Sequence, residues 1–409
     1  MKTIFYVGKP YPHKEALLQL KSAGYKLGLL QDPSVQLRNE DLFDCIVPLD
    51  FSSEQNFEQS LSQVVDLPPM DGLLCVYENY VIFKAIIADK LSLPSLSIDA
   101  ARACTDKYLM RQLFLEHNPD ITPEFTFVDS KERLLEFAEA VGYPLILKPT
   151  NLVKSLLVSK CNDEHELVTA YDKTVAQIED VYRQQHITNR SPGIIVERFI
   201  QGRMCSVAAF ADANGTAHLC DGIVDLVTAQ DIGYDDNFLY ARKLVNDHDH
   251  KLKENILRVA REGMEALDMR ASPAHIEIIY NDTEVKLVEI GARTGGYRPF
   301  LYEQCYGIDM IEQEARIATG DTPNLNSDFK KFGAVYELFP RGESEFISLE
   351  NAKQPNDYAY FHQVAHAGDV IGSAKDGYKA AAIIGITDSD PSSFNRQSDE
   401  AEHVKVVTR

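Results

Sequence analysis

The stretch HIEIIYNDTEVKLVEIGARTGG, residues 275–296, decides the fold of this chain. It holds two apolar runs separated by the polar turn NDTE, and each run carries an acid, Glu277 in the first and Glu289 in the second. Side chains alternate between the two faces of a strand, so Glu277 shares its face with His275 and points away from Ile276. If the two runs pair as a hairpin, Glu277 and Glu289 meet in one pocket.

The residues that follow the second acid in the sequence supply a positive charge and backbone N–H groups that no side chain covers. Two carboxylates that meet repel each other unless a cation lies between them, and oxygen ligands of this kind suit Mg²⁺ that also holds nucleotide phosphates. Arg293 offers a planar set of donors for a phosphate or an acyl phosphate, and Gly295 and Gly296 leave backbone N–H groups open to an anion. The competing interpretation is that both acids are solvated residues at a strand edge. The shared neighbourhood favours a site.

Three further charged residues stand at the ends of structured segments. Lys107 begins the helical segment in TDKYLMRQLF, and Lys148 ends the buried strand in YPLILKP, where an ammonium group that points inward needs an anionic partner. Glu197 closes the apolar run in GIIVERFI, where its carboxylate is either solvated or accepts a hydrogen bond from a ligand amine. Each of the three taken alone can also be an ordinary surface residue.

The composition limits the class of protein and of partner. With 41 basic and 62 acidic residues, the 409-residue chain has a formal charge of -21, which disfavours nucleic acid as a partner and favours a small-molecule substrate. The 7 cysteines are scattered singly, as is typical of a reduced protein. No apolar run has the form of a signal peptide or approaches membrane-spanning length. We therefore expect a cytoplasmic protein with no membrane partner.

The pattern of apolar segments divides the chain into three expected domains. Residues 1–103 alternate strand-like and helical runs, which predicts parallel βαβ units in an α/β domain. Residues 104–320 predict a mixed α+β domain. Residues 221–245, rich in turn-forming and polar residues, predict a long loop near a site. Residues 321–409 predict a small antiparallel lobe.

Five motifs follow one another along nearly the whole chain. They are TDKYLMRQLF (105–114), YPLILKPTN (143–151), IIVERFIQGRMCSV (194–207), HIEIIYN (275–281) and LVEIGARTGGYRP (287–299). In this order they resemble the ATP-grasp superfamily, and within it the carboxylate–amine ligases such as the L-amino-acid ligases. The resemblance implies an ATP-grasp fold in which residues 121–203 form a lid subdomain, with a parallel α/β (pre-ATP-grasp) domain ahead of it and a small antiparallel lobe behind it.

The resemblance also implies a nucleotide site. Lys107 and Lys148 would contact the phosphates of ATP, with Lys148 also near the adenine. Glu197 would accept a hydrogen bond from the adenine amino group. The backbone around Phe199 and Ile200 would form the rest of the purine-binding hinge.

A metal ion and two substrates complete the implied site. Glu277 and Glu289 would hold Mg²⁺, which Mn²⁺ could replace. Arg293 would stabilise the transferred phosphoryl group or the acyl phosphate. His275 could orient or deprotonate the incoming amine, although a histidine on a strand is also explained as a packed or hydrogen-bonded residue. The residues expected beside the substrates are Gly295, Gly296 and Arg298. An arginine there suits a substrate carboxylate, and a surface arginine is the alternative.

Three positions depart from the family pattern. The family usually has an acid after the hinge glycine to hold the ribose, and this chain has Met204. The usual E-x-N metal motif becomes EIG, with Gly291 in place of the asparagine ligand. The phosphate-covering loop is normally rich in glycine, yet TNLVKSLL, residues 150–157, has none, so Lys154 and Ser155 are the candidates to replace its backbone contacts.

The expected activity is ATP-dependent ligation of a carboxylate to an amine through an acyl phosphate, with amino acids or short peptides as substrates. Many relatives are dimers, so a homodimer is a possible assembly. Two alternatives stay open. One is an ATP-binding sensor or scaffold without turnover, which the three departures support, and the other is a different ATP-grasp ligase such as a carboxylase. Amine-dependent release of ADP distinguishes a ligase from a sensor.

Overall fold

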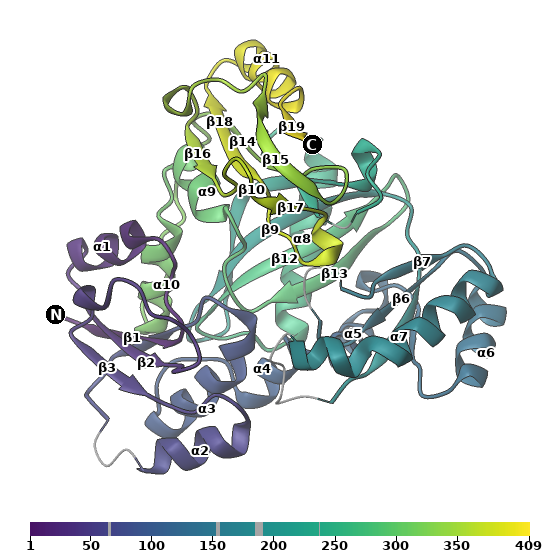
Figure 1. Ribbon diagram of the computed structural model, residues 1–409. Helices are drawn as coiled ribbons and strands as arrows, with labels where there is room; N and C mark the ends of the chain where they lie inside the picture. Colours follow the sequence, from purple (N-terminus) through teal and green to yellow (C-terminus); the bar gives the residue numbers. More distant parts are fainter. Residues whose placement is uncertain (64–66, 153–155, 185–190, 237) are drawn as a thin grey trace.

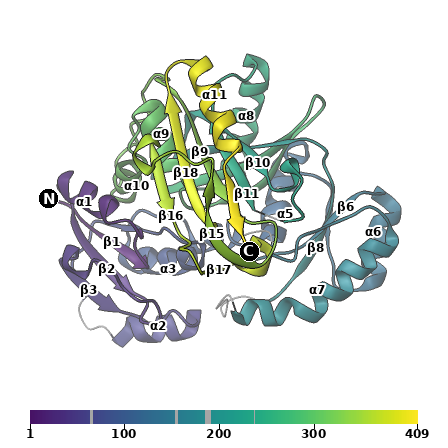
Figure 2. The same ribbon diagram turned by 45° about the horizontal axis from the view of Figure 1, so that its top comes forward.

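The computed structural model describes residues 1–63, 67–152, 156–184, 191–236 and 238–409, and these form four sheets with helices packed around them (Figure 1). The N-terminal sheet lies on one side of the molecule, a four-stranded sheet lies on the other, and an eight-stranded sheet stands between them (Figures 1 and 2). The expected combination of a parallel α/β part with antiparallel α+β parts is confirmed.

The N-terminal sheet is parallel and has the strand order β3-β2-β1-β4. Its strands are β1 (Thr3–Gly8), β2 (Lys26–Gln31), β3 (Cys45–Pro48) and β4 (Gly72–Leu74). The helices of this part are α1 (Lys14–Ser22), α2 (Glu54–Gln63), α3 (Val81–Leu91) and α4 (Ile98–Ala103). The βαβ units predicted for residues 1–103 are therefore present.

The apolar run of β1 shows why this sheet is covered on both faces. Four consecutive residues, Ile4 to Val7, are completely buried, as is typical of a parallel strand between two layers of helices. Gly28 on β2 lies directly opposite Phe5, and a Cβ atom at position 28 would come within 2.2 Å of the Phe5 ring. The glycine therefore makes room for the aromatic side chain.

The eight-stranded sheet is antiparallel and has the order β13-β12-β9-β10-β11-β14-β18-β16. Its strands are β9 (Arg203–Ala211), β10 (Ala217–Thr228), β11 (Leu239–Leu244), β12 (Ser272–Tyr280), β13 (Val285–Gly291), β14 (Phe332–Leu338), β16 (Tyr360–Gln363) and β18 (Ala382–Asp388). The helices beside it are α8 (His250–Ala266), α9 (Arg298–Tyr306) and α10 (Met310–Ala318).

The prediction of a long loop over residues 221–245 is wrong. Strand β10 continues to Thr228 and β11 begins at Leu239, so most of this segment is paired in the middle of the eight-stranded sheet. The polar residues that suggest a loop, such as Asp225, alternate with buried apolar residues such as Val224 and Leu226. A strand with one polar face explains the pattern without a loop.

The second sheet of four strands, called the four-stranded sheet from here on to distinguish it from the N-terminal sheet, has the order β5-β8-β6-β7. Its strands are β5 (Phe125–Phe127), β6 (Leu145–Pro149), β7 (Ser159–Cys161) and β8 (Ile194–Arg198), and its helices are α6 (Lys131–Val141) and α7 (Glu164–Gln184). Helix α5 (Lys107–His117) precedes it. This sheet occupies the segment predicted as the lid subdomain, while the domain limits themselves stay a prediction.

The C-terminal segment contributes to two sheets. Strands β14, β16 and β18 extend the eight-stranded sheet, and α11 (Pro391–Glu402) packs against β14 and β18. Strands β15 (Ser344–Glu350), β17 (Val370–Ile371) and β19 (Lys405–Thr408) form a separate antiparallel sheet. Short 3-10 helices complete the described elements: η1 (Glu40–Leu42), η2 (Glu78–Tyr80), η3 (Pro119–Ile121), η4 (Gln230–Ile232), η5 (Pro355–Asp357) and η6 (Ala374–Asp376).

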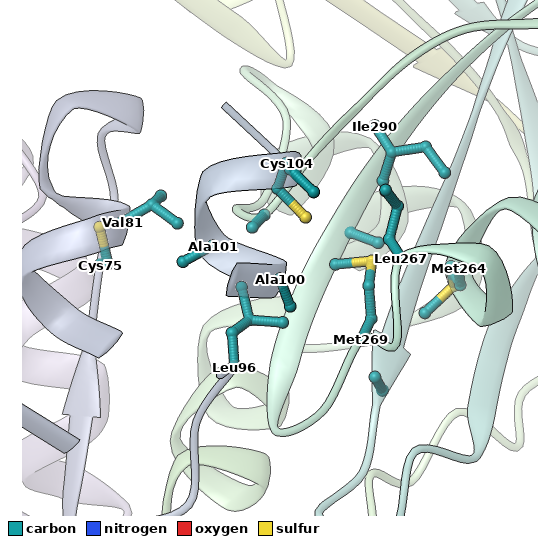
Figure 3. Close-up of a cluster of buried hydrophobic side chains, with 14 of the residues drawn as sticks. Cys75, Val81, Leu96, Ala100, Ala101, Cys104, Met264, Leu267, Met269 and Ile290 are labelled. Atoms are coloured by element: carbon teal, nitrogen blue, oxygen red, sulfur yellow. The ribbon is translucent and has the colours of Figure 1, made fainter. Parts of the chain in front are cut away.

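One apolar core joins the N-terminal part to the eight-stranded sheet. Figure 3 shows Cys75 and Val81, on either side of η2, in the same cluster as Ala101 of α4 and Ile290 of β13. Ile290 is completely buried. Because neighbouring side chains of a strand point in opposite directions, the burial of Ile290 turns Glu289 and Gly291 toward the other face.

Candidate active site

The hairpin of β12 and β13 brings the two acids together as the sequence predicts. Glu277 lies directly opposite Glu289 in the register, and His275 lies opposite Gly291. The turn is closed by Asn281, whose side-chain oxygen accepts hydrogen bonds from the backbone N–H groups of two residues further along the turn. Cross-strand partners on one face have Cβ atoms roughly 5 Å apart, so the two carboxylates open into a common space.

This pair fits a hard divalent cation. The Glu277 and Glu289 side chains keep 19% and 29% of their surface exposed, whereas Ile276, Ile278 and Ile290 between them are completely buried. The apolar residues anchor the hairpin, and the carboxylates stay accessible on its other face. Oxygen donors at neighbouring positions are the ligand set that Mg²⁺ or Mn²⁺ prefers, so the donor chemistry agrees with the expected metal.

Lys107 reaches the same place from helix α5. The helix begins there because Asp106 caps it, accepting hydrogen bonds from the backbone N–H groups of Tyr108 and Leu109. The Lys107 ammonium lies 3.0 Å from Glu289 and donates to the carbonyl oxygen of Leu152 at 2.9 Å. Burial alone raises the pKa of Glu289, but the charge of Lys107 lies so close that the pKa falls well below its ordinary value.

Lys148 and Glu197 meet in a buried trio whose third member, Arg111, was not predicted from the sequence. The Glu197 carboxylate lies 2.7 Å from the Lys148 ammonium and accepts a hydrogen bond from Nε of Arg111 at 2.7 Å. Arg111 also donates to the carbonyl oxygen of Val288 at 2.7 Å. Arg111 lies one helical turn after Lys107 in TDKYLMRQLF, so the two side chains lie on the same face of the helix. This spacing could have indicated that Arg111 belongs to the site.

The trio carries one more positive than negative charge in a buried place. Lys148, Glu197 and Arg111 are 6%, 4% and 1% exposed. Burial would raise the pKa of Glu197, yet the two cations hold it below its ordinary value, while burial lowers the pKa of Lys148 to about 8. A buried excess of positive charge is costly unless an anion approaches it.

His275 is held between Glu277 and the loop that follows β13. Its Nε2 atom lies 3.2 Å from a Glu277 carboxylate oxygen, and among the described residues its buried Nδ1 atom has no hydrogen-bond partner. A Cβ atom at Gly295 would come within 2.5 Å of Nδ1, whereas one at Gly296 would meet nothing within 4 Å. Burial lowers the pKa of His275, so the imidazole is neutral and able to accept a proton at neutral pH.

Arg298 is a buried cation that lacks a carboxylate partner within the part of the chain that the structure describes. It is 2% exposed and donates two hydrogen bonds to the Ser206 hydroxyl and one to the carbonyl oxygen of Gly296. Burial lowers its pKa to about 10, and the nearby guanidinium of Arg242 adds to this effect. A desolvated guanidinium without a counter-charge is a good place for a substrate anion.

Arg293 pairs with Glu78, a residue that was not predicted from the sequence as part of the site. The Nε atom of Arg293 lies 3.2 Å from the Glu78 carboxylate, and its Nη1 donates to the carbonyl oxygen of Thr294 at 3.2 Å. Glu78 closely follows β4. An acid at the carboxyl end of a parallel strand was the signal that could have revealed it.

The expected purine hinge lies between β8 and β9. The Phe199 backbone N–H donates to the carbonyl oxygen of Pro144, and the Lys160 ammonium lies 4.0 Å from the centre of the Phe199 ring. Ile200 is buried. Met204 lies on β9, opposite Leu226 of β10.

Two of the candidate residues, Lys154 and Ser155, lie outside the described residues, so their assignment stays a prediction. All other candidate residues lie on three segments of the structure. These are the start of α5, the four-stranded sheet together with the residues just after β8, and the β12–β13 hairpin together with the loop that follows it. A cavity of about 750 Å³, lined by residues such as His218, Asp221 and Asp328, includes none of them and is separate from this site.

Comparison with known protein families finds a match over the segment that holds most of these residues. A family model described as "ATP-grasp domain" matches residues 141–299. The alanine–anticapsin ligase of Bacillus subtilis (strain 168) is 24% identical over 274 residues, which are 62% of this chain and 56% of that protein. The corresponding ligase of Bacillus amyloliquefaciens is 23% identical over 275 residues, or 63% of this chain and 56% of that protein. The chain thus spans little more than half the length of these curated relatives.

Two solved structures share the fold of this chain over its whole length. The L-amino acid ligase from Bacillus licheniformis superposes with a TM-score of 0.80 at 18% identity, covering 100% of this chain and 99% of that one. The phosphoribosylglycinamide synthetase from Anaerococcus prevotii has a TM-score of 0.72 at 20% identity, covering 100% of both chains. Within the described parts of the chain, none of the helices combines the length and apolar character needed to cross a bilayer.

Proposed function

We propose that this chain is an ATP-dependent carboxylate–amine ligase acting on amino acids or short peptides, supported by the ATP-grasp family model that matches residues 141–299 and by the fold that the chain shares with an L-amino acid ligase. The observation that carries the proposal is the meeting of Glu277 and Glu289 across one hairpin, with Lys107 against the second acid and Arg293 just beyond the same strand end. Opposed carboxylates beside two cations suit a polyphosphate held through a metal ion.

The proposed reaction has two steps. An oxygen of the acid substrate attacks the γ-phosphorus of ATP, the bond to the β-phosphate oxygen breaks, and ADP leaves the acyl phosphate behind. The amine nitrogen then attacks the acyl carbon, the carbon–oxygen bond to phosphate breaks, and the nitrogen loses a proton. The products are an amide, ADP and inorganic phosphate. ATP is needed because a free carboxylate is a poor electrophile.

We assign the nucleotide to the space between the four-stranded sheet and the β12–β13 hairpin. Lys107 and Lys148 bind its phosphates, and the positive excess of the buried trio supports Lys148 in this role. Glu197 accepts from the adenine amino group, with the backbone around Phe199 and Ile200 completing the hinge. The assignment of Lys154 and Ser155 to the phosphate cover rests on the family pattern.

We assign the metal to Glu277 and Glu289, where Mg²⁺, or Mn²⁺ in its place, supplies positive charge to the phosphates. Arg293 adjoins this position and stabilises charge on the transferred phosphoryl group. Neutral His275, held by Glu277, orients the amine and takes its proton.

We assign the substrates to the loop after β13. The paired glycines, Gly295 and Gly296, expose backbone beside His275. Arg298, buried without a carboxylate partner among the described residues, binds a substrate carboxylate, which favours an amino acid or peptide over a simple amine.

A screen of amino-acid pairs tests the proposal. Purified protein is incubated with ATP, Mg²⁺ and pairs of amino acids, ADP and phosphate release are measured, and the products are identified by mass spectrometry. We expect ADP release that needs both substrates and a product equal in mass to the two amino acids less one water. ATP binding without amine-dependent ADP release over the whole screen contradicts the proposal.

That negative result defines the second candidate, an ATP-binding sensor or scaffold. Gly291 favours it, because it removes the side chain that usually supplies a further metal ligand. Met204 at the expected ribose-binding position and the absence of glycine from residues 150–157 point the same way. A carboxylase is a third outcome, recognisable by ADP release that depends on bicarbonate.

A further inference from the structure

Glu78 stands at a place where parallel sheets commonly bind ligands. From β1 the chain continues to β2 on one side, whereas β4 lies on the other side of β1. The carboxyl ends of β1 and β4 therefore flank a switch point, outside which open α/β sheets bind their ligands. Glu78 follows β4 in η2, so the N-terminal sheet aims its carboxylate at this position.

The Glu78 carboxylate reaches across to the end of β13. Its Oε2 atom lies 3.2 Å from Nε of Arg293, and the two side chains are 14% and 25% exposed. A Cβ atom built on Gly291 would lie 3.3 Å from the same oxygen. A side chain at position 291 would therefore be in tight contact with this carboxylate, which would have to shift by a few tenths of an ångström to admit its Cβ atom.

The surroundings hold the two partners in place. Cys75 and Val81, on either side of Glu78, belong to the same buried cluster as Ile290, which precedes Gly291 (Figure 3). Apolar packing on one face thus sets the distance between η2 and the end of β13. The second contact of Arg293, from Nη1 to the Thr294 carbonyl oxygen, fixes the plane of the guanidinium group.

We propose that Glu78 is the positioning residue of Arg293, and that Gly291 leaves room for the Glu78 carboxylate in this arrangement. The inference rests on the proposed ligase function. An unpaired arginine samples many rotamers, and ordering it during the reaction costs free energy. A carboxylate on Nε leaves the outer edge of the guanidinium for the transferred phosphoryl group. The N-terminal domain then takes part in phosphoryl transfer without touching the substrates.

The test uses the full chain and the amino-acid pair that gives the highest rate. The variants are Glu78→Gln, Gly291→Asn and the double variant, with Glu58→Gln, an exposed acid on α2, as the matched control. We expect Glu78→Gln to lower kcat roughly 10- to 100-fold, because a misplaced catalytic group costs about this much. The KM values for ATP and for both substrates stay unchanged.

Gly291→Asn tests whether a side chain at the end of β13 disturbs the contact between Glu78 and Arg293 while Glu78 itself is unchanged. Its side chain displaces the carboxylate, so kcat falls to the same level as in Glu78→Gln. The double variant is no slower than either single variant, because both changes break the same contact. Glu58→Gln keeps the wild-type rate. If Glu78→Gln unfolds in a thermal scan, Gly291→Asn carries the test alone.

The outcomes separate this inference from the proposed function. An inactive wild type overturns both. In an active wild type, an unchanged kcat for Glu78→Gln overturns the positioning role alone. A raised KM for one substrate at unchanged kcat in Glu78→Gln assigns Glu78 to substrate binding instead. A higher kcat for Gly291→Asn shows that a side chain at position 291 does not disturb the contact between Glu78 and Arg293. Either result also overturns the inference.

Discussion

At the scale of single residues, the charged groups of the site are tuned by burial and by their neighbours. Lys148 is the clearest case. Its ammonium is 6% exposed, lies 2.7 Å from Glu197, and shares that carboxylate with Arg111. Burial lowers its pKa to about 8 despite the carboxylate. Its charge therefore depends on pH in the range where the protein is assayed.

The affinity for ATP should fall as the pH rises through about 8. Below this pH Lys148 is protonated and attracts the phosphates, and above it the neutral amine does not. We expect the Kd for ATP to rise by at most roughly tenfold per pH unit between pH 8 and 10. Calorimetric titration over this range measures it. Lys148→Met should bind weakly with a flatter pH dependence, whereas Lys131→Met, at the start of α6 where the ammonium pairs with Asp172, should follow the wild type. Parallel curves for wild type and Lys148→Met contradict the assignment.

The metal role of Glu289 has a separate test. Glu289→Gln keeps the size of the side chain but removes the charge that we assign to metal binding, so we expect ADP formation to fall roughly 100-fold or more. Binding of Mn²⁺ with ADP, followed by electron paramagnetic resonance, should weaken in parallel. Asp282→Asn, in the exposed turn of the same hairpin, is the control and should change neither quantity. Normal turnover by Glu289→Gln excludes the metal role.

At the scale of elements, the hairpin of β12 and β13 and its following loop build most of the site. The register sets Glu277 opposite Glu289 and His275 opposite Gly291. The loop then folds back so that Gly295 contacts His275, and Tyr297 caps the start of helix α9 in the left-handed region with φ +61°. One continuous segment thus provides both acids, the histidine and the buried Arg298.

The paired glycines should respond differently to the same substitution. A Cβ atom at Gly295 would lie 2.5 Å from His275 Nδ1, so Gly295→Ala must displace the imidazole or the loop. We expect a loss of about 1–3 kcal/mol in the free energy of unfolding and a lower kcat. Gly296→Ala meets nothing within 4 Å and should stay within about 0.5 kcal/mol of wild type. Denaturant unfolding of both variants measures this difference. Equal stabilities contradict the close packing of Gly295 against His275.

At the scale of the whole molecule, helix α10 links the parts. It follows the site in the sequence, yet Ile311, Ala315 and Ala318 pack into the core of the N-terminal sheet. Glu314 on this helix is 2% exposed and accepts a hydrogen bond from the Tyr11 hydroxyl at 3.0 Å. Burial raises its pKa to about 7, with Lys84 and Asp309 as the charged neighbours that also act on it.

Stability should therefore fall as the pH rises from about 5 to 7. The folded pKa of Glu314 lies above its unfolded value of 4.5, so the folded state holds a proton that the unfolded state has lost. The free energy of unfolding decreases across this window by at most about 1.4 kcal/mol per pH unit from this group, and not further above it. Glu314→Gln cannot ionise and should gain stability relative to wild type over the window.

Thermal unfolding of wild type and Glu314→Gln at several pH values between 5 and 8 measures this. Glu303→Gln, an exposed acid on α9, serves as the control and should run parallel to the wild type. A difference between wild type and Glu314→Gln that stays constant with pH shows that burial does not shift this carboxyl group.

Much of the architecture was predictable because periodicity and turn residues are local signals. The parallel N-terminal sheet, the β12–β13 hairpin and the meeting of Glu277 with Glu289 follow from alternation along the chain. Residues 221–245 were wrongly predicted as a loop because polar residues on one face of a strand mimic a turn-rich segment. The assignments of individual residues to ATP, metal and substrates stay predictions.

The amino-acid sequence alone determined the order of the motifs, the parallel N-terminal units and the facing of Glu277 and Glu289 in one hairpin, since each of these depends on residues close together in the chain. Only the tertiary structure decided which distant groups meet. It joined Arg111 to Glu197 across 86 positions, placed Glu78 against Arg293, and buried Glu314 beside Tyr11. Such pairs depend on how separate sheets pack together, and local patterns along the chain carry no record of that packing.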